Sequence, residues 1–280
     1  MVATAAGCDR VPQEVFRDLR AGAESGWDFS SRWIRPVNDQ FNLSNIYTNE
    51  VVPVDLNAIL YKCELNLAYF ASILSGWSGD AGDTYSRDGY ADQSAAWKDV
   101  AELRGDAINA LLWDAQHKHW RDFNLTSQTW THYTAEDAQF AAESAAVKAG
   151  TSTAAAAAAA VKASTSALRS SATHTGAHTT PAAAAAPSYA TIAYWIPMWA
   201  TLSPPDSTTS DELVSSLQAS GLLQVAGVLT TTVSTGQQWD SPEAWAPLVM
   251  FTIEGLQNLN TANSLSLAVR IEWMFPFSSH

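Results

Sequence analysis

Apolar side chains spaced three and four residues apart dominate the segment from Pro53 to Leu74. They are Leu56, Ile59, Leu60, Cys63, Leu67, Phe70 and Leu74. This spacing places them on one face of a helix with 3.6 residues per turn, and a proline near the start fits the first helical turn. We therefore predict an amphipathic helix over this segment.

The same spacing recurs in other parts of the chain. It predicts helices around 97–112 and 245–256, and shorter patterns predict helices over 211–219 and 263–274. Only the segment 119–133 alternates aromatic and polar residues in the manner of a small hairpin. Long strand patterns are otherwise missing from the sequence. The predicted fold class is therefore all-α, with long helices and substantial connecting loops.

Residues 142–187 differ in kind from this helical pattern. Alanine, serine and threonine dominate them, with an alanine run over 154–160 and a proline-bounded block over 181–187. Alanine favours helix, but a face made only of alanine buries too little area to dock firmly. Ordered patterning resumes at Tyr189. We therefore predict a flexible insertion within a single domain that spans residues 1–280.

The charge balance excludes several kinds of partner. The chain has 15 basic and 28 acidic side chains, which give a net charge of −13. A chain this acidic repels phosphate groups, which argues against a nucleic-acid or anionic-membrane partner and favours a small neutral molecule or another protein. No run of about 20 apolar residues is present, so the sequence predicts no membrane span. It leaves the localisation open.

One carboxylate stands among aromatic residues near the N-terminus. Asp28 lies between Trp27 and Phe29, just after Gly26. A carboxyl group held against aromatic surface is poorly solvated, so its pKa rises toward the range in which it can donate a proton. Asp28 is accordingly a candidate general acid. A helix-cap aspartate beside core aromatics is the structural alternative.

The segment 235–247 combines aromatic and polar groups on a turn-rich stretch. It contains Trp239, Asp240 and Trp245 and leads directly into the predicted apolar helix. Amides and carboxylates bind sugar hydroxyls, and tryptophan faces stack on sugar rings. The twelve tryptophans of the chain are compatible with such a site. We predict a sugar pocket here, with a structural loop as the alternative.

These two segments resemble a known enzyme family, the trehalases of glycoside hydrolase family 37. Residues 237–247 resemble the second signature of the family, and residues 21–33 resemble the segment that holds its catalytic acid. Three other stretches resemble the family in the expected order: 46–68 with its segment 52–57, then 112–114 followed by Trp120, then 196–199. The resemblance covers residues 10–273, apart from the alanine-rich insertion.

The resemblance implies an (α/α)6 toroid that hydrolyses α,α-trehalose to two glucose molecules with inversion and without a cofactor or metal. It assigns the general acid to Asp28 and places Gly26 beside the substrate. Trp239, Asp240 and Trp245 are carried over as substrate-binding pocket residues. An inverting glycosidase also needs a second carboxylate, which activates water on the opposite face of the sugar.

The resemblance does not extend to that second carboxylate. The family's general base is a glutamate in a glycine-rich segment well downstream of the second signature, and this chain has no glutamate beyond Glu272. Glu254 and Glu272 lie at helix-like positions, and we interpret them as ordinary helix residues. We therefore expect an incomplete toroid that lacks the general base, leaves apolar helix faces without partners and has at most trace activity.

Two other functions and one metal site compete with this interpretation. The chain could be a non-catalytic, trehalase-like remnant that binds sugar, or a different inverting (α/α)6 glycosidase. Asp114, His117, His119 and Asp122 could be drawn as a metal cluster, but their spacing fits no standard ligand pattern. We expect solvated loop residues at these four positions and predict no metal.

Overall fold

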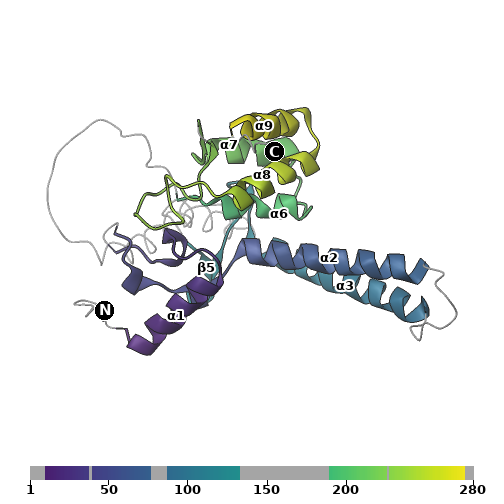
Figure 1. The fold of residues 1–280 in the computed structure, drawn as a ribbon, viewed down its shortest axis with the longest axis horizontal. Coiled ribbons are helices and arrows are strands. Elements are labelled where there is room, and N and C mark those ends of the chain that lie inside the picture. Colours follow the sequence, from purple (N-terminus) through teal and green to yellow (C-terminus); the bar gives the residue numbers. More distant parts are fainter. Residues whose placement is uncertain (1–9, 38–39, 77–86, 133–188, 226, 275–280) are drawn as a thin grey trace, which may run out of the picture. The chain divides into compact units, whose positions relative to one another are not determined.

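The computed structural model describes residues 10–37, 40–76, 87–132, 189–225 and 227–274 (Figure 1). Its α-helices are α1 (Pro12–Glu24), α2 (Val54–Gly76), α3 (Arg87–Leu112), α6 (Ile196–Trp199), α7 (Ser210–Ala219), α8 (Ala246–Leu259) and α9 (Ala262–Met274). Short 3-10 turns are η1 (Ser31–Trp33), η2 (Leu43–Asn45), η3 (Thr48–Glu50) and η4 (Ile192–Trp195). Most residues in regular secondary structure therefore lie in helices, as the all-α prediction requires. The predicted insertion over 142–187 lies outside the described residues and stays a prediction.

The strands in the described residues are all two residues long. They are β1 (Val51–Val52), β2 (Trp113–Asp114), β3 (His119–Trp120), β4 (Phe123–Asn124), β5 (Thr129–Trp130), β6 (Leu223–Gln224) and β7 (Gly227–Val228). The antiparallel pair β4 and β5 confirms a hairpin within 119–133, and β1 adds to β4 with Val51 opposite Asn124. β2 pairs with β3 and β6 with β7, also antiparallel.

Helices α2 and α3 pack side by side along their length (Figure 1). Their contact uses small and polar residues: Ser94 donates to the carbonyl of Ala68 at 2.9 Å, and the Arg104 guanidinium pairs with Glu64 at 2.7 Å. The helix over 53–74 is confirmed. The apolar face that predicted it, including Leu56 and Phe70, is exposed, because alanines and this ion pair form the contact.

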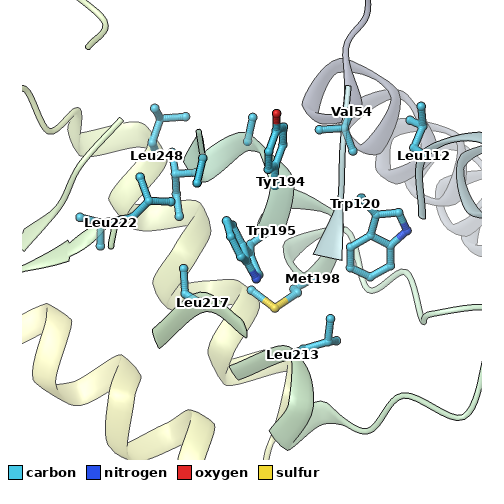
Figure 2. Packing of buried hydrophobic residues seen from close by; sticks show 14 of the residues in the cluster. Val54, Leu112, Trp120, Tyr194, Trp195, Met198, Leu213, Leu217, Leu222 and Leu248 are labelled. Carbon is cyan, nitrogen blue, oxygen red and sulfur yellow. The ribbon is translucent and has the colours of Figure 1, made fainter. Parts of the chain in front are cut away.

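The main core joins elements from both ends of the chain. Figure 2 shows Trp195, Met198 and Leu217 packed together, with Val54 and Leu112 from α2 and α3 at one edge. Trp195 and Met198 come from η4 and α6, and Leu217 comes from α7. Large apolar side chains of this kind contribute most of the free energy of folding when they leave water.

A close contact between α6 and α8 depends on a glycine. A Cβ at Gly255 would lie 3.0 Å from the backbone nitrogen of Trp199 and 3.2 Å from the Cβ of Met198. The ring of Trp199 also packs against Phe251 at 4.5 Å and donates a hydrogen bond to Glu254 at 2.8 Å. Glu254 thus lies in a helix, where the sequence placed it. In the part of the chain that the structure describes, no helix is both long and apolar enough to cross a membrane.

Helix α1, which the sequence patterns did not indicate, leads directly to the candidate site. Asp18 holds this helix in place. Its carboxylate accepts hydrogen bonds from the backbone and side-chain nitrogens of Asn49, both at 2.8 Å, and forms an ion pair with Arg10. Near the end of α1, Gly22 lies so close to Phe29 that a Cβ would be 3.0 Å from the ring. The helix therefore sets the position of the residues that follow Glu24.

Candidate active site

The chain turns sharply between α1 and Asp28. Ser25 accepts a hydrogen bond from the backbone N–H of Trp27 at 3.1 Å, and Gly26 has a φ of 80°, a conformation that favours glycine. Trp27 is buried, Phe29 is half-buried and Asp28 between them is exposed. The structure therefore differs from the expectation of a poorly solvated Asp28, because this residue is exposed while Trp27 is buried.

Three tryptophan rings meet beside this turn and form what we call the tryptophan stack, Trp27, Trp239 and Trp245. The rings of Trp239 and Trp245 are parallel within 10° with centroids 4.3 Å apart, and Trp27 lies 5.2 Å from Trp239 at 26°. The backbone N–H of Trp239 donates to the carbonyl of Phe29 at 2.9 Å. The structure thus brings together the two segments that the sequence singled out, although about 210 residues separate them.

Asp240 connects the same two segments through buried hydrogen bonds. Its carboxylate is fully buried. One oxygen accepts hydrogen bonds from the hydroxyls of Ser30, Ser31 and Thr231 at 2.7 to 3.0 Å. The other accepts from the Ser31 backbone N–H at 2.9 Å and from the Thr235 hydroxyl. A carboxylate enclosed in this way connects two segments of the same chain. This position differs from the sugar-contacting one that we expected for Asp240.

Arg32, which directly follows this pair of serines, is anchored by two carboxylates. It is fully buried, and its guanidinium makes two hydrogen bonds each to Asp55 and Asp122, at 2.7 to 2.8 Å. The same group lies 4.6 Å from the ring of Trp27 and 4.5 Å from that of Trp33. Burial alone would lower the pKa of Arg32, but the charges of Asp122 and Asp55 outweigh it and raise that pKa further.

Sequence reasoning missed the role of both carboxylate partners of Arg32. Asp55 lies in the first turn of α2, and the carboxylate of Asp122 also accepts from the Val54 backbone N–H at 2.8 Å. Asp122 was expected to be a solvated loop residue, which is wrong because it is fully buried. The available signal was Arg32 itself, since an arginine among tryptophans is stable in a core only with carboxylate partners.

Among the other residues of the suggested metal cluster, Asp114 is buried while His117 and His119 are half-buried. Asp114 is fully buried, lies 2.8 Å from the Nδ1 of His117 and accepts from Arg121 at 3.2 Å. The expectation of a solvated residue is wrong for Asp114, whereas His117 and His119 stay partly exposed. Ligating atoms of Asp114, His117 and His119 lie within 4.8 Å of one another. The guanidinium of Arg121 on the same carboxylate would repel a divalent cation.

Burial and neighbouring charges have opposing effects on the pKa values of Asp114 and His119. Burial would raise the pKa of Asp114, but the His117 hydrogen bond and the charges of His119, His117 and Arg121 lower it well below its usual range. Burial lowers the pKa of His119 to about 4, so this imidazole is neutral at pH 7. Its ring stacks on Tyr194 at 5.2 Å.

A mostly helical chain that presents a carboxylate next to a tryptophan stack has the features of a helical carbohydrate-active protein. A family model described as Trehalase matches residues 1–195 and 182–279. The chain belongs to the trehalase family. This match confirms the resemblance and, with the helical architecture, the predicted fold class.

One solved structure similar to this chain is the neutral trehalase Nth1 from Saccharomyces cerevisiae. The two share 21% sequence identity with a TM-score of 0.55, and the match covers 94% of this chain. It covers 35% of the yeast chain, so this chain spans about a third of the length of that protein. The likeness at this identity concerns the fold, and it agrees with a partial trehalase-type helical toroid.

Proposed function

We propose that this chain acts on α,α-trehalose, with Asp28 as the general acid of an inverting hydrolysis. The observation that carries the proposal is the position of Asp28, which is reachable from solvent while the residues on both sides of it are held in the fold. Trp27 is buried and stacks on Trp239, and the carbonyl of Phe29 accepts a hydrogen bond from the backbone of Trp239. A proton donor on a fixed segment beside aromatic rings suits a sugar substrate.

The proposed mechanism divides the work between two carboxyl groups. The acid protonates the glycosidic oxygen, and a base roughly 6.5–9.5 Å away activates water on the opposite face of the sugar. Asp240 does not suit the second role, because it is fully buried and bonded within the protein. Glu254 does not suit it either, because it accepts from Trp199 on α6. We therefore assign the acid, and no base, to the described residues.

The exposure of Asp28 sets a requirement for this chemistry. We propose that trehalose must cover Asp28 and displace its water before the proton transfer can occur. Gly26 and the outer face of Trp245 are the proposed contacts that hold the sugar there. The chemistry needs neither a metal nor a cofactor.

A non-catalytic sugar-binding protein is the second candidate, and one observation favours it. In the described residues, no hydrogen bond or ion pair orients the carboxylate of Asp28, whereas general acids are normally held by neighbouring groups. A protein that binds trehalose through the tryptophan stack without hydrolysing it would need no group to orient Asp28.

Calorimetric titration with trehalose and a glucose-release assay test the proposal together. We expect the purified chain to bind trehalose more tightly than sucrose and to release glucose at a trace but measurable rate. Asp28→Asn should retain binding and abolish that release, whereas Asp99→Asn, at an exposed position on α3, should change neither. Turnover that survives in Asp28→Asn would remove Asp28 from its role. Binding with no release in either variant would favour the second candidate.

A further inference from the structure

The carboxylate of Asp240 is buried without a basic partner. Among the described residues, Asp240 makes no salt bridge with a lysine, arginine or histidine, although its side chain is fully enclosed. A bare buried carboxylate is costly, so its charge must be stabilised by hydrogen bonds. Four hydroxyls and one backbone N–H supply them, from Ser30, Ser31, Thr231 and Thr235.

This set of donors requires an acceptor on both side-chain oxygens. An ionised carboxylate offers only acceptors, whereas an asparagine side chain would turn an NH2 group toward donors on one side. The backbone N–H of Ser31 cannot rotate away and is bonded to both oxygens, at 2.9 and 3.0 Å. Asp240 therefore suits this place through its charge as well as its shape.

The hydrogen bonds to Asp240 act on the segment that carries Asp28. Ser30 and Ser31 follow Asp28 by two and three residues, and the next residue, Arg32, is anchored by its own two carboxylates. On the other side, Asp240 directly follows Trp239, whose backbone binds the carbonyl of Phe29. One buried carboxylate thus connects the proposed acid segment to the tryptophan stack.

We propose that Asp240 is a positioning residue, which sets the place of Asp28 relative to the tryptophan stack. The role in catalysis rests on the proposed function of Asp28. The connection itself does not, since it concerns only how residues 27–31 are held against residues 239–240. Asp240 acts through these residues and does not contact the sugar.

The test uses Asp240→Asn, Thr235→Val and a matched control. Thr252→Val removes another buried hydroxyl, which donates to Leu248 within α8 at 2.8 Å and has no bond to Asp240. The chains are labelled with 5-fluorotryptophan, and the ¹⁹F lines of Trp27 and Trp239 are assigned with Trp→Phe variants. Hydrogen exchange of the Ser31 amide and calorimetric titration with trehalose, at temperatures well below unfolding, complete the measurements.

We expect Asp240→Asn to shift or broaden both ¹⁹F lines, to speed exchange at Ser31 and to weaken trehalose binding by about tenfold. Thr235→Val should produce the same changes to a smaller extent, and Thr252→Val should leave the lines and the affinity unchanged. A merely structural role would lower the unfolding temperature without moving these readouts. Wild-type lines and affinity in a folded Asp240→Asn chain would overturn the proposal.

Two further outcomes are also decisive. If Asp240→Asn does not fold, Thr235→Val tests the connection through the same ¹⁹F lines, and unchanged lines in that variant would overturn the proposal. If the wild-type chain does not bind trehalose, the proposed function fails. The ¹⁹F lines and the Ser31 exchange then still decide whether Asp240 holds the two segments together.

Discussion

The backbone N–H of Trp239 donates a hydrogen bond to the carbonyl of Phe29 across 2.9 Å, and this bond joins segments from opposite ends of the chain. Trp27 and Trp239 stack next to it, with their ring centroids 5.2 Å apart. The site therefore depends on long-range contacts more than on either segment alone. The following predictions test the groups that hold it.

Replacing the buried guanidinium by an ammonium should unfold the chain more easily. Arg32→Lys keeps the charge but loses the paired hydrogen bonds to Asp55 and Asp122, and it leaves buried carboxylates without partners. We expect the free energy of unfolding to fall by about 3 kcal/mol in urea denaturation. Arg20→Lys, in an exposed pair with Glu24, is the control and should change nothing measurable. Equal stability of the two variants would contradict the prediction.

A methyl group on α1 should disturb the turn that carries Asp28. In Gly22→Ala the new Cβ would lie 3.0 Å from the ring of Phe29 and 3.2 Å from Ile46, and both neighbours are packed. We expect a loss of about 1–3 kcal/mol in the free energy of unfolding, reduced slightly by the better helix propensity of alanine. Gly76→Ala meets no atom within 4 Å and should cause no loss. Full stability in Gly22→Ala would show that Phe29 can move aside.

Acid should destabilise the chain through His119. Its pKa is about 4 in the folded chain and near 6.5 when unfolded, so between these values the unfolded chain binds more protons. The contribution to stability is complete above pH 6.5 and is lost as the pH falls toward 4. The lowered pKa of Asp114 acts in the same direction at still lower pH.

Unfolding temperatures measured by circular dichroism from pH 7.5 to 4.5 check this effect. His119→Asn retains a side-chain donor for the carbonyl of Trp120, which His119 contacts at 3.0 Å, but it has no proton to gain. The variant should therefore lose less stability between pH 6.5 and 4.5 than the wild type. An identical slope in both chains would assign the acid sensitivity to other groups.

Removing the outer ring of the tryptophan stack should weaken sugar binding. Trp245→Ala deletes the ring that lies 4.3 Å from Trp239, and its face is the proposed platform for trehalose. We expect the affinity measured by calorimetry to fall by about tenfold, the value of one stacking contact. Trp273→Ala removes a tryptophan that is 82% exposed on α9, and it should bind as the wild type does. Unchanged affinity in Trp245→Ala would separate the stack from the sugar site.

Sequence patterns predicted five of the helices and singled out the two segments of the candidate site. Spacing of apolar residues predicted α2, α3, α7, α8 and α9, because the period of a helix is a local property of the chain. The same spacing did not determine what the apolar face of α2 would pack against. In the described residues that face is exposed, since Ala68 and Glu64 make the contact with α3.

The charged groups that hold the site, and those that face solvent, follow from the tertiary structure and not from local patterns. Asp28 and Asp240 were both predicted to meet the sugar, yet one is exposed and the other is enclosed by hydroxyls. Likewise, Arg32 found its partners 23 and 90 residues away in Asp55 and Asp122. Local patterns specify periodicity and turn chemistry, whereas the burial and hydrogen bonding of a charge depend on groups that become neighbours only when the chain is folded.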